Sequence, residues 1–264
     1  MLRHELLKHL HVLLQPRTYF EIGVRRGVSL QLSRAKTIAV DPFYEIEREI
    51  LCDLHLVRTT SDEFFARRHP LAHFDEPVID LAFIDGMHLS EYALRDVINV
   101  ERFCHAGSVI VIDDMLPRTV EEAGRTRRGA SEHGAWAGDV YKMVAAFREL
   151  RPDLICLEVN TRPTGTVVLM TPDPASRVLP EAYDRLVAEF VVPDPQEVPD
   201  ETLQRSRAVS PQAVVKAPIW AQVRALRGTP DDQARATIRR LAGDAGLLSG
   251  LTVPPAATRP VGVG

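Results

Sequence analysis

Short runs of β-branched and aromatic residues alternate with helical stretches through the first two thirds of the chain. The run from Val78 to Ile84 is apolar almost throughout, which is typical of a strand in a parallel sheet covered on both faces. Five such runs are expected to be strands: Thr18–Ile22, Thr37–Asp41, Leu54–Thr59, Val78–Ile84 and Ser108–Asp113. The repetition of strand and helix predicts an α/β fold with a doubly wound, mostly parallel sheet.

Helices are expected between the strands and on either side of them: Met1–Leu14, Ser29–Arg34, Tyr44–Leu51, Ser61–Arg68, Leu89–Phe103 and Asp139–Leu150. Two further strands are then expected, at Leu154–Val159 and Thr166–Met170. The gap between these two strands is too short for a helical crossover, so they should pair antiparallel. The sheet would therefore have seven strands and end in a C-terminal antiparallel hairpin.

Proline divides the chain into two parts. Residues 1–170 hold 7 of the 19 prolines, and residues 171–264 hold the other 12. We therefore expect an N-terminal helix over 1–17, a packed domain over 18–170, and a Pro-rich helical extension over 171–264 with a loose end from Leu251. Ile219 and Trp220 would anchor the N-terminal helix and this extension, either over the site or in a homo-oligomer contact.

Composition excludes several classes of protein. With 45% hydrophobic and 26% charged residues, the chain resembles ordinary soluble proteins, and no apolar run approaches the roughly 18–20 residues of a membrane span. A net charge of −4 argues against nucleic acid as a partner. Cys52, Cys104 and Cys156 lie far apart without metal-ligand spacing, which indicates buried thiols and a reducing, cytoplasmic compartment.

Ligands of doubly wound sheets bind beyond the carboxyl ends of the strands, and the first strand ends in a glycine turn. Gly23 and Gly27 bracket this turn, and the helix expected from Ser29 offers free N–H donors. The three-glycine pattern of dinucleotide-binding sites fails, because Glu21 stands at a glycine position. An acid there would repel a pyrophosphate and suit a cationic ligand, whereas the alternative is a plain tight turn.

The second and third strands also end in polar residues. Asp41 lies 20 residues after Glu21 and can accept both hydrogen bonds of a ribose diol, or else it is a helix-capping residue before Pro42. Ser61 and Asp62 follow the third strand. For these two residues, a helix cap and a contact with an adenine edge are equally good interpretations.

Three carboxylates follow the fourth and fifth strands, Asp85 after one and Asp113 with Asp114 after the other. Burying three acids together is costly without a cation, and such oxygen ligands suit Mg²⁺ or Ca²⁺. Alternatively, one of Asp113 and Asp114 simply caps the loop, which would leave too few carboxylate ligands for a metal ion. His88 stands three residues after Asp85 and is a candidate general base, although it could instead cap the following helix.

Together these motifs resemble those of the class I S-adenosylmethionine-dependent methyltransferases, over roughly Thr18 to Met170. Within that superfamily, the segments Ile84–His88 and Ile112–Asp114 resemble the metal-dependent small-molecule O-methyltransferases. The bacterial sugar O-methyltransferases of macrolide and aminocoumarin biosynthesis are the most similar group. The resemblance implies a Rossmann-like methyltransferase fold and O-methylation of a small molecule such as a sugar or a natural-product intermediate.

The resemblance also implies roles for individual residues. Glu21, Gly23, Gly27 and Ser29 would hold the methionine part of the cofactor S-adenosylmethionine. Asp41 would hold the ribose, and Ser61 and Asp62 would lie near the adenine. Asp85 would also contact the cofactor. Asp85, Asp113 and Asp114 would hold Mg²⁺, and His88 would be the catalytic base. Some relatives use an aspartate two residues after the first metal ligand as the base, where this chain has Met87.

Three other functions remain open: a metal-independent N- or O-methyltransferase, a catalytically inactive cofactor-binding relative, and a nicotinamide-dependent oxidoreductase, against which the failed glycine pattern argues.

The long segment from Met115 to Gly138 is expected to be a substrate lid, or else a solvated loop. Trp136 would form an apolar wall of this lid, and His133 is an alternative base. The arginines of the segment, Arg118, Arg125, Arg127 and Arg128, would allow an anionic substrate. Asp139 is expected to cap the helix that follows.

Overall fold

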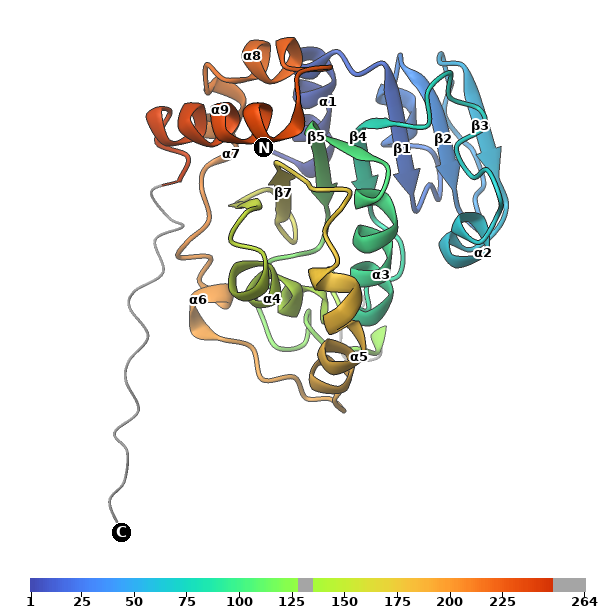
Figure 1. The fold of residues 1–264 in the computed structure, drawn as a ribbon. Helices are drawn as coiled ribbons and strands as arrows, with labels where there is room; N and C mark the ends of the chain where they lie inside the picture. The colour runs from blue at the N-terminus through green and yellow to red at the C-terminus, as the bar shows by residue number, and fades with distance from the viewer. Residues whose placement is uncertain (128–134, 249–264) are drawn as a thin grey trace.

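The protein is built on a seven-stranded sheet in the computed structural model, which describes residues 1–127 and 135–248 (Figure 1). The strands are β1 (Thr18–Ile22), β2 (Lys36–Val40), β3 (Leu54–Val57), β4 (Ile79–Ile84), β5 (Cys104–Ile112), β6 (Ile155–Val159) and β7 (Thr166–Met170). They lie in the order β3-β2-β1-β4-β5-β7-β6. β1 to β5 are parallel, and β7 pairs antiparallel with both β5 and β6. The predicted α/β sheet with its C-terminal antiparallel hairpin is therefore confirmed.

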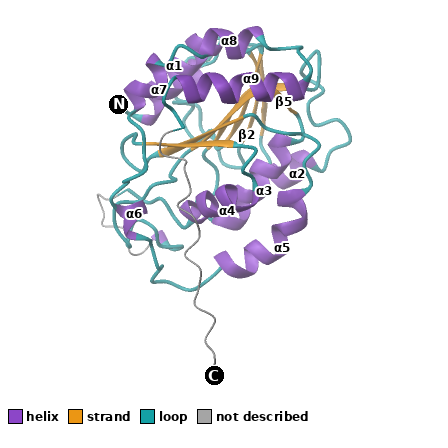
Figure 2. Cartoon of the chain, turned by 60° about the vertical axis from the view of Figure 1, so that its left-hand side comes forward, coloured by secondary structure: helices purple, strands orange, loops and turns teal. Residues whose placement is uncertain are grey.

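Helices cover both faces of the sheet (Figure 2). One face packs against α2 (Ser61–Phe65), α3 (Ser90–Glu101), α4 (Met143–Leu150) and α5 (Val178–Phe190). The other face packs against α1 (Arg3–Leu14), α7 (Pro211–Lys216), α8 (Trp220–Ala225) and α9 (Asp231–Asp244). Every residue of the central strand β4 is buried, as its apolar sequence predicts. The remaining elements are α6 (Asp200–Leu203) and the 3-10 helices η1 (Leu30–Leu32) and η3 (Val140–Lys142).

Two predicted helices are wrong. The stretch Ser29–Arg34 contains only the short helix η1, and Tyr44–Leu51 is not helical. In the second stretch, the backbone amides of Glu45 and Glu47 donate to the carbonyls of Arg25 and Arg26 instead of to carbonyls within their own segment. Hydrogen bonds to the turn after β1 thus replace the local helix that the apolar spacing favours.

The C-terminal extension packs onto the sheet domain through apolar contacts. Ile219 and Trp220 are buried, and the Trp220 indole donates to the carbonyl of Val214 at 2.8 Å. They anchor the extension on the same face as α1, and the loose end expected from Leu251 lies outside the described residues. Cys104 and Cys156 are buried as predicted, and Cys52 is partly exposed. In residues 1–127 and 135–248, no helix is long and apolar enough to cross a lipid bilayer.

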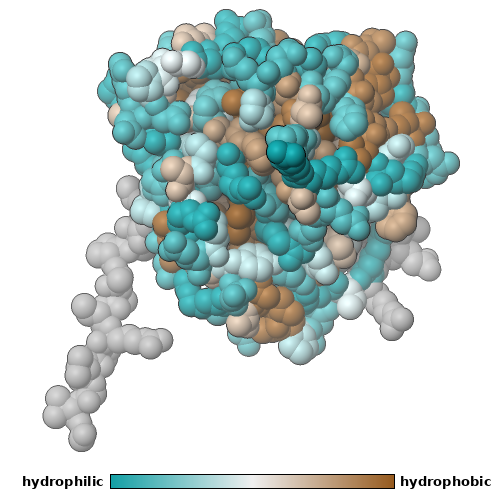
Figure 3. Space-filling model, turned by 45° about the vertical axis from the view of Figure 1, so that its right-hand side comes forward, coloured by the Kyte–Doolittle hydropathy of each residue, from teal (hydrophilic) through white to brown (hydrophobic). Residues whose placement is uncertain are grey.

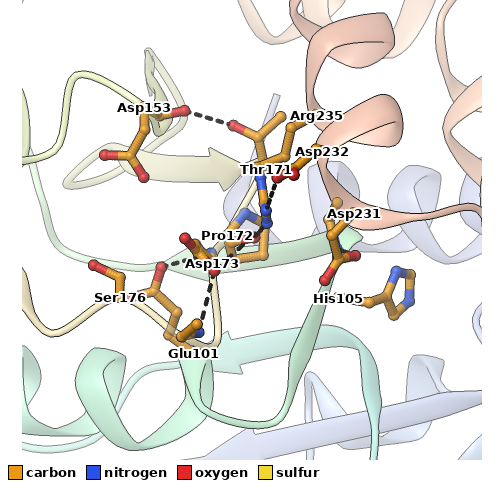
Figure 4. A network of polar contacts seen from close by, with 12 residues as sticks. Glu101, His105, Asp153, Thr171, Pro172, Asp173, Ser176, Asp231, Asp232 and Arg235 are labelled. Carbon is orange, nitrogen blue, oxygen red and sulfur yellow. Dashed lines mark hydrogen bonds and ion pairs between the residues drawn. The ribbon is translucent and has the colours of Figure 1, made fainter.

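A polar network ties α9 to the rest of the molecule (Figure 4). Arg235 of α9 donates to the carbonyl of Pro172 and lies 3.6 Å from the Asp173 carboxylate. The Asp173 amide in turn donates to Glu101 at the end of α3. Asp231, at the start of α9, accepts from the amide of Ala106 in β5 at 2.9 Å. The extension is therefore joined to both a helix and a strand of the sheet domain.

Candidate active site

A cavity of about 790 Å³ opens at the carboxyl ends of β1, β2 and β4. Doubly wound sheets bind their ligands at this edge. The predicted site residues that line it are Gly23, Ser29, Asp41, Ser61, Asp62, Asp85 and His88. Arg3 and His4 of α1 line it as well, although no sequence motif singled them out. Glu21, Gly27, Asp113 and Asp114 are not in the cavity wall and lie behind or beside it.

Large apolar side chains of the cavity wall are exposed, among them Phe43 and Met87. Phe43 is 86% exposed and Met87 is 54% exposed. Most large apolar residues in the described part of the chain are buried instead, and hydrophilic residues cover most of the face in Figure 3, with hydrophobic residues gathered in separate patches. Apolar groups at the wall of a cavity are typical of a small-molecule site.

Gly23 lies in the turn after β1, where the backbone passes very close to β4. Its φ is +88°, and a Cβ on this residue would lie 1.9 Å from the carbonyl oxygen of Asp85. Asp41 holds the same turn, because its Oδ2 accepts from the amides of Val24 at 2.9 Å and Arg25 at 2.7 Å. Each carboxylate oxygen can accept a second hydrogen bond, so Asp41 keeps acceptor capacity for a ligand hydroxyl.

Glu21 is buried behind the cavity wall. Its carboxylate accepts from the Tyr19 hydroxyl at 2.6 Å and from the Ser29 hydroxyl at 2.7 Å. Burial raises the pKa of Glu21 to about 8, against the effect of these two hydrogen bonds. The structure therefore places Ser29 in the cavity wall and Glu21 as the residue that holds Ser29.

His88 lies between two acids at the end of the cavity near β5. Its Nε2 is 3.1 Å from Asp114 Oδ2 and 3.4 Å from Asp85 Oδ1. Its Nδ1 is 2.8 Å from the carbonyl oxygen of Trp136, whose ring stacks on the imidazole at 4.8 Å. Burial lowers the pKa of His88, but the nearby carboxylates outweigh burial and raise it to about 9.

Asp113 and Asp114 point to different partners. Arg3 Nε lies 2.6 Å from Asp113 Oδ2, whereas Asp114 accepts from the Thr164 hydroxyl and faces His88. The strand ends at Ile112 and Asp114 has a φ of +62°, so the chain turns here and directs the two neighbouring side chains to different partners. The ligand atoms within 4.8 Å of one another thus come from Asp85, His88 and Asp114, which differs from the predicted set of three acids.

The cluster of Asp85, His88 and Asp114 has donors that fit a divalent cation. It offers two carboxylate oxygens and one imidazole nitrogen at close range. Carboxylate oxygens suit hard cations such as Mg²⁺ and Mn²⁺, and the imidazole suits softer divalent ions. Burial raises the pKa of Asp114 to about 6, despite the nearby His88. A bound cation would favour the charged carboxylates.

Without a metal ion, the charged His88 should stabilise the folded protein below pH 6.5. The folded-state pKa of about 9 lies above the ordinary value of 6.5, so this contribution is complete below pH 6.5 and is lost as pH rises to 9. Through His88, the wild type should lose at most about 3 kcal/mol of unfolding free energy over this range. The His88→Gln variant should not show this loss.

Urea unfolding in the presence of a chelator, at several values of pH, measures this effect. Buried Glu21 and Asp96, whose pKa values are raised to about 8 and about 7, change stability in the same direction. The comparison of the wild type with His88→Gln isolates the histidine. Equal slopes in the two proteins would refute the ion-pair assignment.

Asp96 of α3 is a cavity residue that the sequence analysis missed. It is 3% exposed, and burial raises its pKa to about 7 although the Ser61 hydroxyl donates a hydrogen bond to it. A signal existed, because Asp96 falls at helical spacing from the buried residues Ala93 and Val100. An acid on the apolar face of an amphipathic helix indicates a buried polar contact.

Ser61 and Asp62 do not cap their helix. Thr60 is the N-cap of α2, and its hydroxyl accepts from the amide of Glu63. The Asp62 carboxylate accepts from Arg95 Nε at 2.6 Å, while Ser61 holds Asp96. Both residues line the cavity, so of the two interpretations of this motif only the ligand contact remains open.

The described part of the expected lid is held by ion pairs. Arg125 donates to Glu91 and to Asp139 at 2.6 Å each, so its guanidinium is already paired. Asp139 accepts from the Ser90 amide and thus caps α3. Its side chain makes no cap hydrogen bond to η3, the helix that follows it, so the predicted cap is wrong. Trp136 stacks on His88. Arg128 and His133 lie outside the described residues.

Comparison with known families identifies the segment that forms this site. Residues 20–115 match the model of a family described as a methyltransferase domain. By this match, the segment resembles a methyltransferase domain. It runs from β1 to the residue after Asp114, and so includes the predicted cofactor and metal residues and His88, whereas Trp136 and His133 fall outside it in sequence. The helix α1 and everything after Met115 lie outside the matched methyltransferase segment.

Several solved structures are similar to this chain, all at low sequence identity. Cofactor-bound Rv0187 from MTB has 15% identity and a TM-score of 0.45 over 66% of this chain and 82% of its own. The O-methyltransferase TomG from Streptomyces achromogenes, in complex with SAM, has 18% identity and a TM-score of 0.42, with coverages of 65% and 80%. The O-methyltransferase from Bacillus cereus, in complex with SAH, has 18% identity and a TM-score of 0.44, with coverages of 64% and 80%. No curated protein matches the sequence.

Proposed function

We propose that this protein transfers the methyl group of S-adenosylmethionine to a hydroxyl oxygen of a small molecule. One observation carries the proposal: within the segment that resembles a methyltransferase domain, a single cavity joins the Gly23 turn and Asp41 to an acid–histidine cluster. A volume of about 790 Å³ is within the range of small-molecule sites. Sugars and hydroxylated natural-product intermediates are the acceptor classes we propose.

The cavity residues divide between the parts of the cofactor. The turn at Gly23 allows close approach to the methionine part, and Ser29, held by Glu21, would contact the same part. Asp41 would accept from the ribose hydroxyls with its remaining acceptor capacity. Ser61 and Asp62 would lie near the adenine.

In its neutral form, His88 would take the proton of the acceptor hydroxyl. The charged form, which the neighbouring carboxylates favour while no cation is bound, would first have to release its own proton. The Nδ1 of His88 is engaged by the Trp136 carbonyl, so Nε2 is the nitrogen that can receive a proton. Asp114 Oδ2, 3.1 Å away, would stabilise the resulting imidazolium. The freed oxygen then attacks the methyl carbon in line, the C–O bond forms as the C–S bond breaks, and S-adenosylhomocysteine leaves.

A divalent cation, for which we propose Mg²⁺, fits beside this base. Asp85 and Asp114 would be its protein ligands, since Mg²⁺ commonly uses one or two carboxylates and otherwise water or substrate oxygens. Such an ion lowers the pKa of a bound hydroxyl and orients it. Asp113 is paired with Arg3 and would stabilise the surrounding charge.

Binding of S-adenosylhomocysteine should raise the unfolding temperature of the protein. A ligand at about 100 times its dissociation constant stabilises a protein by roughly 2.7 kcal/mol, which corresponds to a few degrees for a chain of this size. NAD serves as the control and should cause no shift. A shift with NAD alone, or none with S-adenosylhomocysteine, would refute the proposed cofactor.

The methyl acceptor can then be sought by transfer of label from methyl-labelled cofactor to hydroxylated small molecules, with Mg²⁺ and with a chelator. Label transfer that stops with the chelator supports the metal-assisted reaction. Transfer that continues unchanged supports a metal-independent methyltransferase, in which the charged His88 between Asp85 and Asp114 occupies the place of the cation.

A further inference from the structure

Arg3 enters the cavity from outside the methyltransferase segment. It is the first residue of α1, and with His4 it lines the same cavity as Gly23 and Asp85. We propose that Arg3 binds the carboxylate group of the methionine part of the cofactor. This inference rests on the proposed function, since it requires S-adenosylmethionine as the ligand.

The position of Arg3 is held by backbone hydrogen bonds. Its amide donates to the carbonyl of Arg162, and the Arg162 amide donates to the carbonyl of Met1. Arg162 lies in the turn between β6 and β7, which also contains Thr164, the residue that donates to Asp114. The start of α1 is therefore attached to the same turn as the acid cluster, which orients Arg3 toward the cavity end near Asp113.

The Arg3 guanidinium keeps donors available for an anion. Its Nε lies 2.6 Å from Asp113 Oδ2, and its side chain is 26% exposed. Within the described residues, its two terminal nitrogens have no hydrogen-bond partner. A guanidinium presents five N–H donors and often binds a carboxylate through two of them. Arg3 can thus hold Asp113 and a ligand carboxylate together.

The charges around the cavity suit an amino-acid zwitterion. Asp85 and Arg3 both line the cavity, and Asp85 is one of the acids whose charge acts on Arg3. A ligand ammonium beside Asp85 can therefore have its own carboxylate beside Arg3. The neighbouring His4 has a pKa lowered by burial and by Arg3, so it is the poorer cation. Two other arginines line the cavity. Arg26 is paired with Glu47, and the backbone of Arg25 is held by Asp41, the residue proposed for the ribose.

Two ligands that differ only in the carboxylate test this inference. Isothermal titration would compare S-adenosylhomocysteine with S-adenosyl-3-thiopropylamine, in the wild type and in Arg3→Gln. The wild type should bind S-adenosylhomocysteine at least about tenfold more tightly, since hydrogen bonds to charged groups are strong. Arg3→Gln should bind both ligands equally, with S-adenosylhomocysteine weakened about tenfold.

Two further variants serve as controls. Lys8→Gln removes an exposed cation of the same helix outside the cavity, and it should keep the wild-type preference. Arg3→Lys keeps the charge beside Asp113 and should retain part of the preference, which separates anion binding from a loss of folding.

The outcomes distinguish this inference from the proposed function. An Arg3→Gln protein that keeps the preference for the carboxylate overturns the inference, and so does one that weakens only the binding of an acidic methyl acceptor. If the wild type binds neither ligand, the proposed function itself fails, and the inference fails with it.

Discussion

Replacing Asp85 with asparagine is expected to slow methyl transfer by about 10²–10⁴-fold, the range in which a positioned acid–base group contributes. Asp85 faces His88 Nε2 at 3.4 Å and is one of the two proposed carboxylate ligands of the cation. Asparagine keeps the shape but loses the charge. The rate with saturating cofactor and the affinity for Mn²⁺, used as a spectroscopic substitute for Mg²⁺, are the two quantities to measure.

The matched variant for Asp85→Asn is His88→Gln. If His88 is the base rather than a ligand, this variant should lose a similar factor in rate while keeping its affinity for Mn²⁺. Asp85→Asn should lose both the rate and the affinity. A wild-type rate in Asp85→Asn would refute the proposed site, and a parallel loss of Mn²⁺ affinity in His88→Gln would make the histidine a ligand.

Replacing Gly23 with alanine is expected to lower the unfolding free energy by more than about 4 kcal/mol, a size reached only by severe packing or strain effects. The new Cβ would lie 1.9 Å from the carbonyl oxygen of Asp85, and both partners of this clash are backbone. β1 and β4 would have to move apart beside the cavity, so binding of S-adenosylhomocysteine should also be lost. Chemical denaturation and calorimetric titration measure the two effects.

Gly228→Ala is the control for backbone strain. Gly228 has a similar φ of +80°, but a Cβ there would meet no atom within 4 Å. This variant should lose only the roughly 1–2 kcal/mol of a left-handed residue with a side chain. If Gly23→Ala costs no more than Gly228→Ala, the close approach of β1 to β4 is not rigid, and the clash with Asp85 does not set the stability of this turn.

Much of the fold could be predicted from the sequence, because its strands are apolar, short and separated by helical spacing. β1 and β7 have the predicted bounds, and β6 and β7 pair antiparallel as the short gap between them predicts. Burial on both faces makes a strand such as β4 apolar at every position except Asp80, and this pattern is independent of the distant contacts that the strand makes.

The helix predicted at Tyr44–Leu51 shows where such local reasoning fails. The amides of Glu45 and Glu47 bond to the turn after β1, a contact between segments that only the folded chain brings together. Asp139 is a similar case, because it caps α3 rather than the helix beside it in sequence. Hydrogen-bond partners of loop residues are set by tertiary packing, which the local pattern of apolar residues does not encode.

For the site, the sequence alone predicts that polar residues lie at the carboxyl edge of the sheet, because parallel strands end at a common edge. The direction of each side chain there depended on the tertiary structure. Asp113 faces Arg3 and Asp114 faces His88, although the two acids are neighbours in sequence. Arg3 itself reaches the cavity because the turn at Arg162 holds the start of α1. A contact that joins residue 3 to residue 162 depends on how the helix and the hairpin pack, and no local motif records it.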